Sequence, residues 1–150
     1  MRLLVFTPPQ TARSEHRLIG DLFARGLRTL HVRKPDATEA ELLAYLNHIP
    51  QQHRSRVVLH ASPNNSKCIA LAKAHQLGGI HYPERLRPSA CERQDGLTTS
   101  TAIHSLQDLF TDFGELDYVF LSPIFDSISK PGYAAAPCTP CLCCQLRSLL

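Results

Sequence analysis

Short apolar runs alternate along the chain with segments in which apolar residues recur at helical spacing. The runs are two to five residues long and rich in aliphatic and aromatic residues, and they predict buried strands. They cover residues 3–6, 29–32, 56–60, 80–81, 97–100 and 118–121. The first intervening segment, which begins near Ser14, carries Leu18, Ile19, Leu22 and Phe23 at the spacing of a helix.

The remaining connections differ in how strongly they predict helices. Thr38 is followed three residues later by Glu41, which is the pattern of a capping box at a helix start. Asn65 or Ser66 can cap a further helix. Residues 82–96 contain prolines and charges and predict a loop with at most a short helix. The next connection, by contrast, predicts a helix that ends at Gly114, because one apolar helical stripe is formed there by Leu106, Leu109, Phe110 and Phe113.

Repeated strand–helix units predict an α/β protein with a parallel sheet of the TIM-barrel type. A complete barrel of this kind has eight strands and needs about 200 to 250 residues. The chain has 150 residues. We therefore expect an incomplete barrel of about six strands, with residues 1–133 as the barrel part and residues 134–150 as a separate tail.

Composition and charge exclude several classes of function. The hydrophobic content of 43% is enough for a core, and the formal net charge of +3 is small, with no dense basic run. Nucleic acid is therefore not an expected partner. No apolar stretch approaches the roughly 18 residues that span a bilayer, so we expect no membrane association and a cytoplasmic protein.

Polar side chains gather where the predicted strands end. These include Arg33, His60, His81 and His104, and ligands of parallel β/α proteins collect at the carboxyl ends of strands. After the last strand, hydroxyls and a cation suited to a phosphate or pyrophosphate are supplied by Ser127, Ser129 and Lys130. A polar loop after a strand is more often simply solvated, so this pattern alone is weak.

Four segments together resemble the thiamine phosphate synthase/TenI family, in the order of that family's strands. They are Gly26-Leu27-Arg28-Thr29-Leu30-His31-Val32-Arg33-Lys34, Gly78-Gly79-Ile80-His81, Ser100-Thr101-Ala102-Ile103-His104-Ser105-Leu106 and Ser122-Pro123-Ile124-Phe125 with the hydroxyls and lysine that follow. The resemblance covers roughly residues 1 to 133. Four motifs in one order are more specific than any one of them.

The resemblance implies thiamine biosynthesis by a transferase. A synthase would join hydroxymethylpyrimidine, carried as its pyrophosphate, to thiazole phosphate, so both phosphorylated compounds are expected partners. Arg33 and Lys34 would hold the leaving pyrophosphate together with Ser127, Ser129 and Lys130, and Mg²⁺ would be required. Without the resemblance, an arginine at a strand end is more often part of a surface ion pair.

A second reading within the family is the TenI-like thiazole tautomerase, which needs no metal. The His-Ser pair at His104 matches the histidine that moves protons in that branch, and an imidazole suits such a role. As a helix-start residue, His104 could equally be only solvated. His81 matches a family histidine whose expected role is structural, and His31 and His60 are not assigned a role beyond lying near strand ends.

The chain departs from the synthase pattern where metal ligands are expected. His60-Ala61 replaces an Asn-Asp pair, and Glu84 is near the next metal-binding position but out of register. Lys34 stands one position early. Mg²⁺ prefers carboxylate and other oxygen ligands, so these changes weaken the synthase reading, and no metal ligand set is evident.

Beyond Tyr133 the sequence loses the strand pattern and becomes cysteine-rich. The tail contains Cys138, Cys141, Cys143 and Cys144, whose spacing is conceivable for zinc. A non-native or disordered tail is favoured, because neighbouring cysteines are poorly placed on one tetrahedral ion. A third function class then arises: a non-catalytic remnant whose bare sheet edges invite pairing with another copy as a homo-oligomer.

Overall fold

A computed structural model describes residues 3–63 and 65–123 of the chain. The described residues form one six-stranded parallel sheet in which the strands follow one another in chain order. The strands are β1 (Leu4–Phe6), β2 (Thr29–Val32), β3 (Val57–His60), β4 (Gly79–Tyr82), β5 (Thr98–Ile103) and β6 (Tyr118–Leu121). The α/β, incomplete TIM-barrel-like fold predicted from the sequence is confirmed, and all six predicted strands are present.

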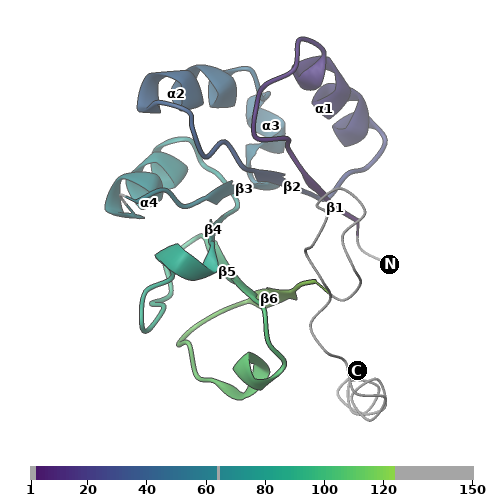
Figure 1. The fold of residues 1–150 in the computed structure, drawn as a ribbon. Coiled ribbons are helices and arrows are strands. Elements are labelled where there is room, and N and C mark those ends of the chain that lie inside the picture. Colours follow the sequence, from purple (N-terminus) through teal and green to yellow (C-terminus); the bar gives the residue numbers. More distant parts are fainter. Residues whose placement is uncertain (1–2, 64, 124–150) are drawn as a thin grey trace.

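The strands lie along an arc, and the longer helices cover its outer side next to β1 to β4 (Figure 1). These helices are α1 (Glu15–Ala24), α2 (Glu39–Asn47), α3 (Gln51–Arg54) and α4 (Asn65–Ala74). The capping box predicted at the start of α2 is present, since Glu41 accepts a hydrogen bond from the amide of Thr38 and its own amide donates to the Thr38 hydroxyl. Among the described residues no helix is long and apolar enough to cross a membrane.

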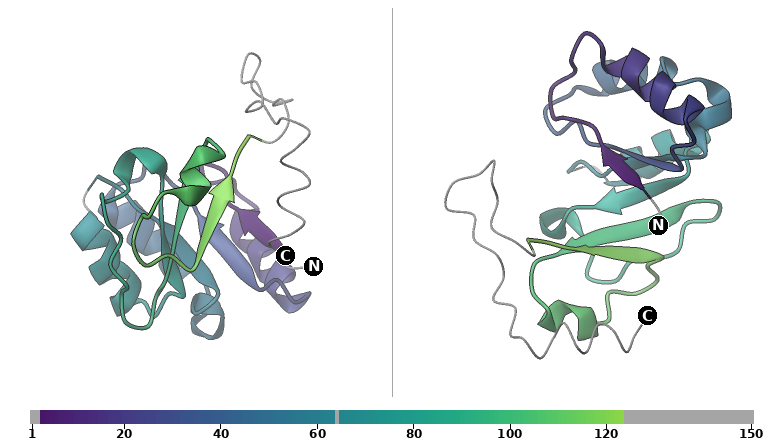
Figure 2. Two further views of the ribbon diagram at one scale, coloured as in Figure 1. Left: turned by 90° about the horizontal axis from the view of Figure 1, so that it is seen from below. Right: turned by 90° about the vertical axis from the view of Figure 1, so that its right-hand side faces the viewer.

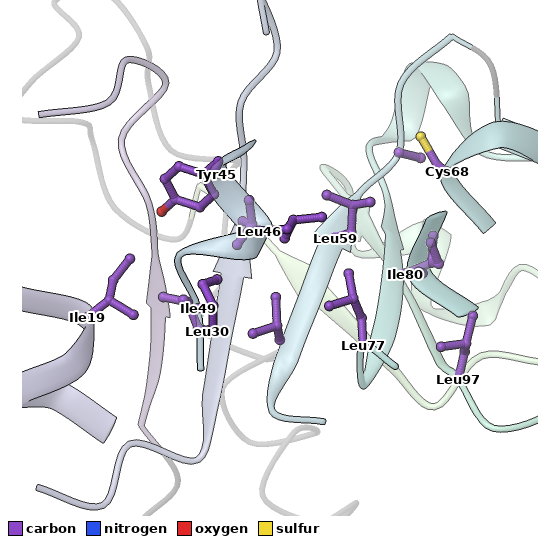
Figure 3. Packing of buried hydrophobic residues seen from close by; sticks show 14 of the residues in the cluster. Ile19, Leu30, Tyr45, Leu46, Ile49, Leu59, Cys68, Leu77, Ile80 and Leu97 are labelled. Atoms are coloured by element: carbon purple, nitrogen blue, oxygen red, sulfur yellow. The ribbon is translucent and has the colours of Figure 1, made fainter. Parts of the chain in front are cut away.

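The hydrophobic core lies between the outer face of the sheet and these helices (Figure 3). Alternate residues of the strands, such as Leu30, Leu59 and Ile80, are fully buried there. Helical residues including Leu46 and Ala72 pack against them from outside. The inner face of the same strands carries the intervening residues, which are far more polar and aromatic.

The sheet is strongly curled, so that its first and last strands approach one another (Figure 2). The rings of Phe6 on β1 and Phe120 on β6 lie with their centroids 5.2 Å apart on the inner face. In a flat sheet with about 4.8 Å between neighbouring strands, five steps would separate them by about 24 Å. The curl therefore brings inner side chains of all six strands close together.

The outer layer thins beyond β4, and one helix prediction was wrong there. Between β4 and β5 the one helical segment is the 3₁₀ turn η1 (Glu84–Leu86), in line with the predicted loop. The stripe before Gly114, however, forms only the 3₁₀ turn η2 (Gln107–Phe110), and Phe110 is 80% exposed. Ser105 and Asp108 bond each other's backbone amides as at a helix start, but Phe113 packs against the guanidinium of Arg87 instead of continuing a helical stripe.

The largest difference in a strand boundary from the sequence prediction is in β5. β5 continues to Ile103 instead of ending at Ser100, because its residues as far as Ile103 pair with β6. On α4 the buried positions are Cys68 and Ala72, with Ile69 only half-buried. The predicted tail, residues 134–150, lies outside the described residues.

Candidate functional site

A pocket of about 570 Å³ opens at the carboxyl ends of β2 to β5. Its walls come from the loops after these strands and from the first turns of α2 and α4. Four cationic side chains line it, against two carboxylates: Arg33, Lys34, Lys67 and Arg85, with Glu39 and Glu84. This excess of positive charge suits an anionic ligand.

Arg33 stands at the exposed mouth of this pocket, directly after β2. Its backbone is fixed because its amide donates a 2.9 Å hydrogen bond to the hydroxyl of buried Thr7, at the end of β1. Within residues 3–63 and 65–123 its guanidinium has no ion-pair partner. The described part of the chain therefore does not place Arg33 in a surface ion pair. Its planar guanidinium is available to bind an oxyanion.

Lys34 also lines the pocket, but its ammonium group is already engaged. Its Nζ lies 2.8 Å from Oε1 of Glu15 and donates a 2.8 Å hydrogen bond to the carbonyl of Pro8, and the lysine side chain is 3% exposed. The hydroxyl of Tyr45 donates a 2.6 Å hydrogen bond to the same carboxylate. The predicted contact of Lys34 with pyrophosphate would require it to leave Glu15, whereas Arg33 needs no such change.

His104 lies at the end of β5 and faces the pocket from the opposite side. Its Nδ1 bonds the carbonyl oxygen of Ser122, which accepts, so Nδ1 carries the proton and Nε2 has a free lone pair. Nε2 lies 3.6 Å from Oε2 of Glu84. An imidazole held in this tautomer, beside a carboxylate that would stabilise its protonated form, can accept and return a proton.

Three histidines meet on the inner face of the sheet, below the pocket. Nδ1 of His31 lies 3.2 Å from Nε2 of His60, and the rings of His60 and His81 have centroids 4.3 Å apart. Burial lowers the pKa of His31 to about 4 and that of His81 to about 3. Burial also lowers the pKa of His60, reinforced by the neighbouring histidines, so all three are neutral at pH 7.

Sequence reasoning placed His60 and His81 at neighbouring strand ends but missed that His31 joins them on the inner face. His60, His81, Ser100 and Tyr118 are register partners across β3, β4, β5 and β6, and so form one row on one face. His31 pairs with Val58, two residues before His60, and therefore points to the same side. Alternation within each strand gives the face of each histidine, but grouping the three also requires the register between β2, β3 and β4.

The remaining predicted anion ligands, Ser127, Ser129 and Lys130, lie outside the described residues. Mg²⁺ does not fit the residues that are described. The pocket carboxylates are committed elsewhere, Glu39 to Lys67 at 3.2 Å and Glu84 beside His104. The side chain of Ala61, buried at 7% exposure at a position where the family resemblance implies a carboxylate, offers no ligand atom.

The fold places the chain in the class of β/α-barrel proteins, and its pocket lies at the carboxyl ends of the parallel strands, where ligand sites of this class are found. Among solved structures the chain is similar to a thiamine phosphate pyrophosphorylase from Bacteroides thetaiotaomicron, with 32% identity and a TM-score of 0.66. The match covers 83% of this chain and 59% of that one, so the chain spans less than two thirds of its relative's length. The chain belongs to a thiamine phosphate synthase-like family. No protein-family model and no curated protein matched it.

Proposed function

We propose that the chain acts in thiamine biosynthesis and binds a pyrophosphate-bearing pyrimidine in the pocket at the carboxyl ends of β2 to β5. The observation that carries this proposal is the guanidinium of Arg33, which lies at the pocket mouth without an ion-pair partner among the described residues. A bidentate arginine is well suited to a diphosphate oxygen pair. Arg85 lies on the facing loop and adds a second positive charge.

The reaction proposed first is the synthase-like transfer of hydroxymethylpyrimidine from its pyrophosphate to thiazole phosphate. In it, Arg33 holds the departing pyrophosphate and offsets the charge that grows on it as the carbon–oxygen bond breaks. The oxygen ligands among the described residues do not fit Mg²⁺. The described pocket residues therefore contribute positive charge and substrate orientation to this reaction. The similar solved structure, named as a thiamine phosphate pyrophosphorylase, supports this reaction class.

The experiment combines binding with turnover. Pyrophosphate titrated into the purified chain by calorimetry should bind, and Arg33→Met should weaken it about tenfold or more, because a charge-assisted bidentate contact contributes about 1.5–3 kcal/mol. Arg17→Met, on α1 away from the pocket, is the control. Incubation with both phosphorylated substrates, with and without Mg²⁺, should release pyrophosphate. Absence of both binding and release would reject the proposal in favour of a non-catalytic chain.

A second reaction is favoured by one specific contact, that of His104 with Glu84. In a tautomerase, Nε2 of His104 would remove a proton from a thiazole ring carbon and return it to another, and Glu84 would stabilise the imidazolium between the two transfers. His104→Gln should then abolish deuterium exchange into the thiazole ring, while EDTA leaves it unchanged. Exchange that persists in His104→Gln would exclude this role.

A further inference from the structure

Three imidazoles converge on the concave face of the sheet at the spacing of metal ligands. One ring nitrogen from each of His31, His60 and His81 lies within 4.8 Å of the other two. His31 is fully buried, His81 is 3% exposed and His60 is half-buried. They come from three adjacent strands, β2, β3 and β4, so the sheet itself sets their relative positions.

The distance between two of these nitrogens already fits a tetrahedral ion. With Zn–N bonds of about 2.0–2.1 Å, two ligands of a tetrahedral zinc lie about 3.3 Å apart. Nδ1 of His31 and Nε2 of His60 are 3.2 Å apart. His81 must approach by about an ångström or more, a movement within the reach of a ring rotation.

In two of the three histidines, the ring nitrogen that faces away from the other histidines lies within hydrogen-bond distance of a hydroxyl group, and this orients the ring. Nε2 of His31 lies 2.9 Å from the hydroxyl oxygen of Tyr118. Nδ1 of His81 lies 3.0 Å from the hydroxyl oxygen of Ser100. In the tautomers that donate to these hydroxyls, Nδ1 of His31 and Nε2 of His81 keep their lone pairs, which is how metal-binding histidines are oriented in proteins.

We propose that His31, His60 and His81 form a transition-metal site that takes Zn²⁺, with Tyr118 and Ser100 orienting two of the ligands. Imidazole nitrogen suits zinc and its neighbours in the first transition row, whereas Mg²⁺ requires oxygen. His60 also lines the pocket, so the fourth coordination position opens toward it. Water or an oxygen of a bound anion would complete the tetrahedron. This proposal does not depend on the proposed function.

The test uses Co²⁺ as a spectroscopic substitute for zinc in untagged full-length chain. Because the cysteine-rich tail could bind the same ion, all four tail cysteines, Cys138, Cys141, Cys143 and Cys144, are replaced with serine. In that background, one equivalent of Co²⁺ should produce the intense visible bands of tetrahedral coordination without the near-ultraviolet bands of thiolate ligands. Added Zn²⁺ should remove them by competition.

Variants then locate the ion. His60→Ala should weaken Co²⁺ binding by far more than tenfold, and Tyr118→Phe by about tenfold, the usual range for the loss of an orienting hydrogen bond. His48→Ala, an exposed histidine on the outer side of the molecule, should leave binding unchanged. Circular dichroism of each variant checks the fold.

The proposal would be overturned by either of two results. The first is that the chain without its four tail cysteines shows no tetrahedral cobalt spectrum while folded. The second is that a folded His60→Ala variant binds Co²⁺ as tightly as its parent. If metal binding disappears with the tail cysteines alone, the ion belongs to the tail and the histidine site is rejected.

Discussion

The hydroxyl oxygen of Tyr118 on β6 lies 2.9 Å from Nε2 of His31 on β2, although the two strands are four positions apart in the sheet. This contact crosses the concave face and joins residues separated by 87 positions in sequence. It ties the last described strand to the N-terminal half of the chain.

Tyr118→Phe should lower the free energy of unfolding by about 0.5–1.5 kcal/mol, because it removes one hydrogen bond and retains the ring. Urea unfolding followed by circular dichroism measures it. Val119→Ala, at the next residue but on the outer face and 37% exposed, should have a smaller effect. A Tyr118→Phe variant as stable as the parent chain would mean that the cross-face bond contributes nothing.

Glu15→Gln should be strongly destabilising, by about 3–5 kcal/mol, because the buried ammonium of Lys34 loses its counterion. The matched control is Glu39→Gln. Its carboxylate pairs with Lys67 at the surface, where both side chains are more than 60% exposed, and the expected loss is below about 1 kcal/mol. Thermal unfolding of the two variants measures both losses of stability. Similar losses for the two variants would contradict a structural role for the buried pair.

Acid should remove part of this stabilisation. Burial acts to raise the pKa of Glu15, but hydrogen bonds from Lys34 and Tyr45 outweigh it and hold the pKa below the ordinary value of 4.5. The unfolded chain therefore takes up this proton first, so the contribution is complete above about pH 4.5 and is lost as the pH falls through the lower, folded-state value. Stability measured between pH 7 and pH 3 should fall more steeply for the parent chain than for Glu15→Gln. Parallel curves would rule out this linkage.

Gly79 should not tolerate a side chain. A Cβ at this position would lie 2.5 Å from the carbonyl oxygen of Thr98 on the neighbouring strand, and backbone there cannot move without disturbing the pairing of β4 and β5. Gly79→Ala should cost about 1–3 kcal/mol or more. At Gly20 on α1, where nothing lies within 4 Å of a new Cβ, alanine should instead stabilise by up to about 1 kcal/mol. Shifts of the denaturant midpoint, relative to the parent chain, that have the same sign for both variants would contradict this prediction.

Local patterns predicted the strands well because each is a short apolar run whose burial does not depend on distant detail. Thr29–Val32 and Tyr118–Leu121 were located to the residue. The helix predicted before Gly114 is wrong because periodicity cannot reveal that Phe113 packs against Arg87, a residue of a distant loop. Helical spacing is only a tendency, and such contacts override it.

The candidate site was predicted in part. Arg33 and His104 do line one pocket, as strand-end reasoning expected. The engagement of Lys34 with Glu15 could not be foreseen, since it depends on how α1 packs beside β2. The histidine cluster requires the relative register of three strands, which sequence spacing within each strand does not contain.

The contact between Phe6 and Phe120 has a spectroscopic consequence. Their rings meet edge to face at an interplanar angle of 65°, so protons of one ring lie in the magnetic shielding region of the other. Aromatic resonances of these two residues should be displaced from their random-coil positions only while the sheet is curled. A single pair of chemical shifts would then report, in solution and without any ligand, whether β1 and β6 face each other.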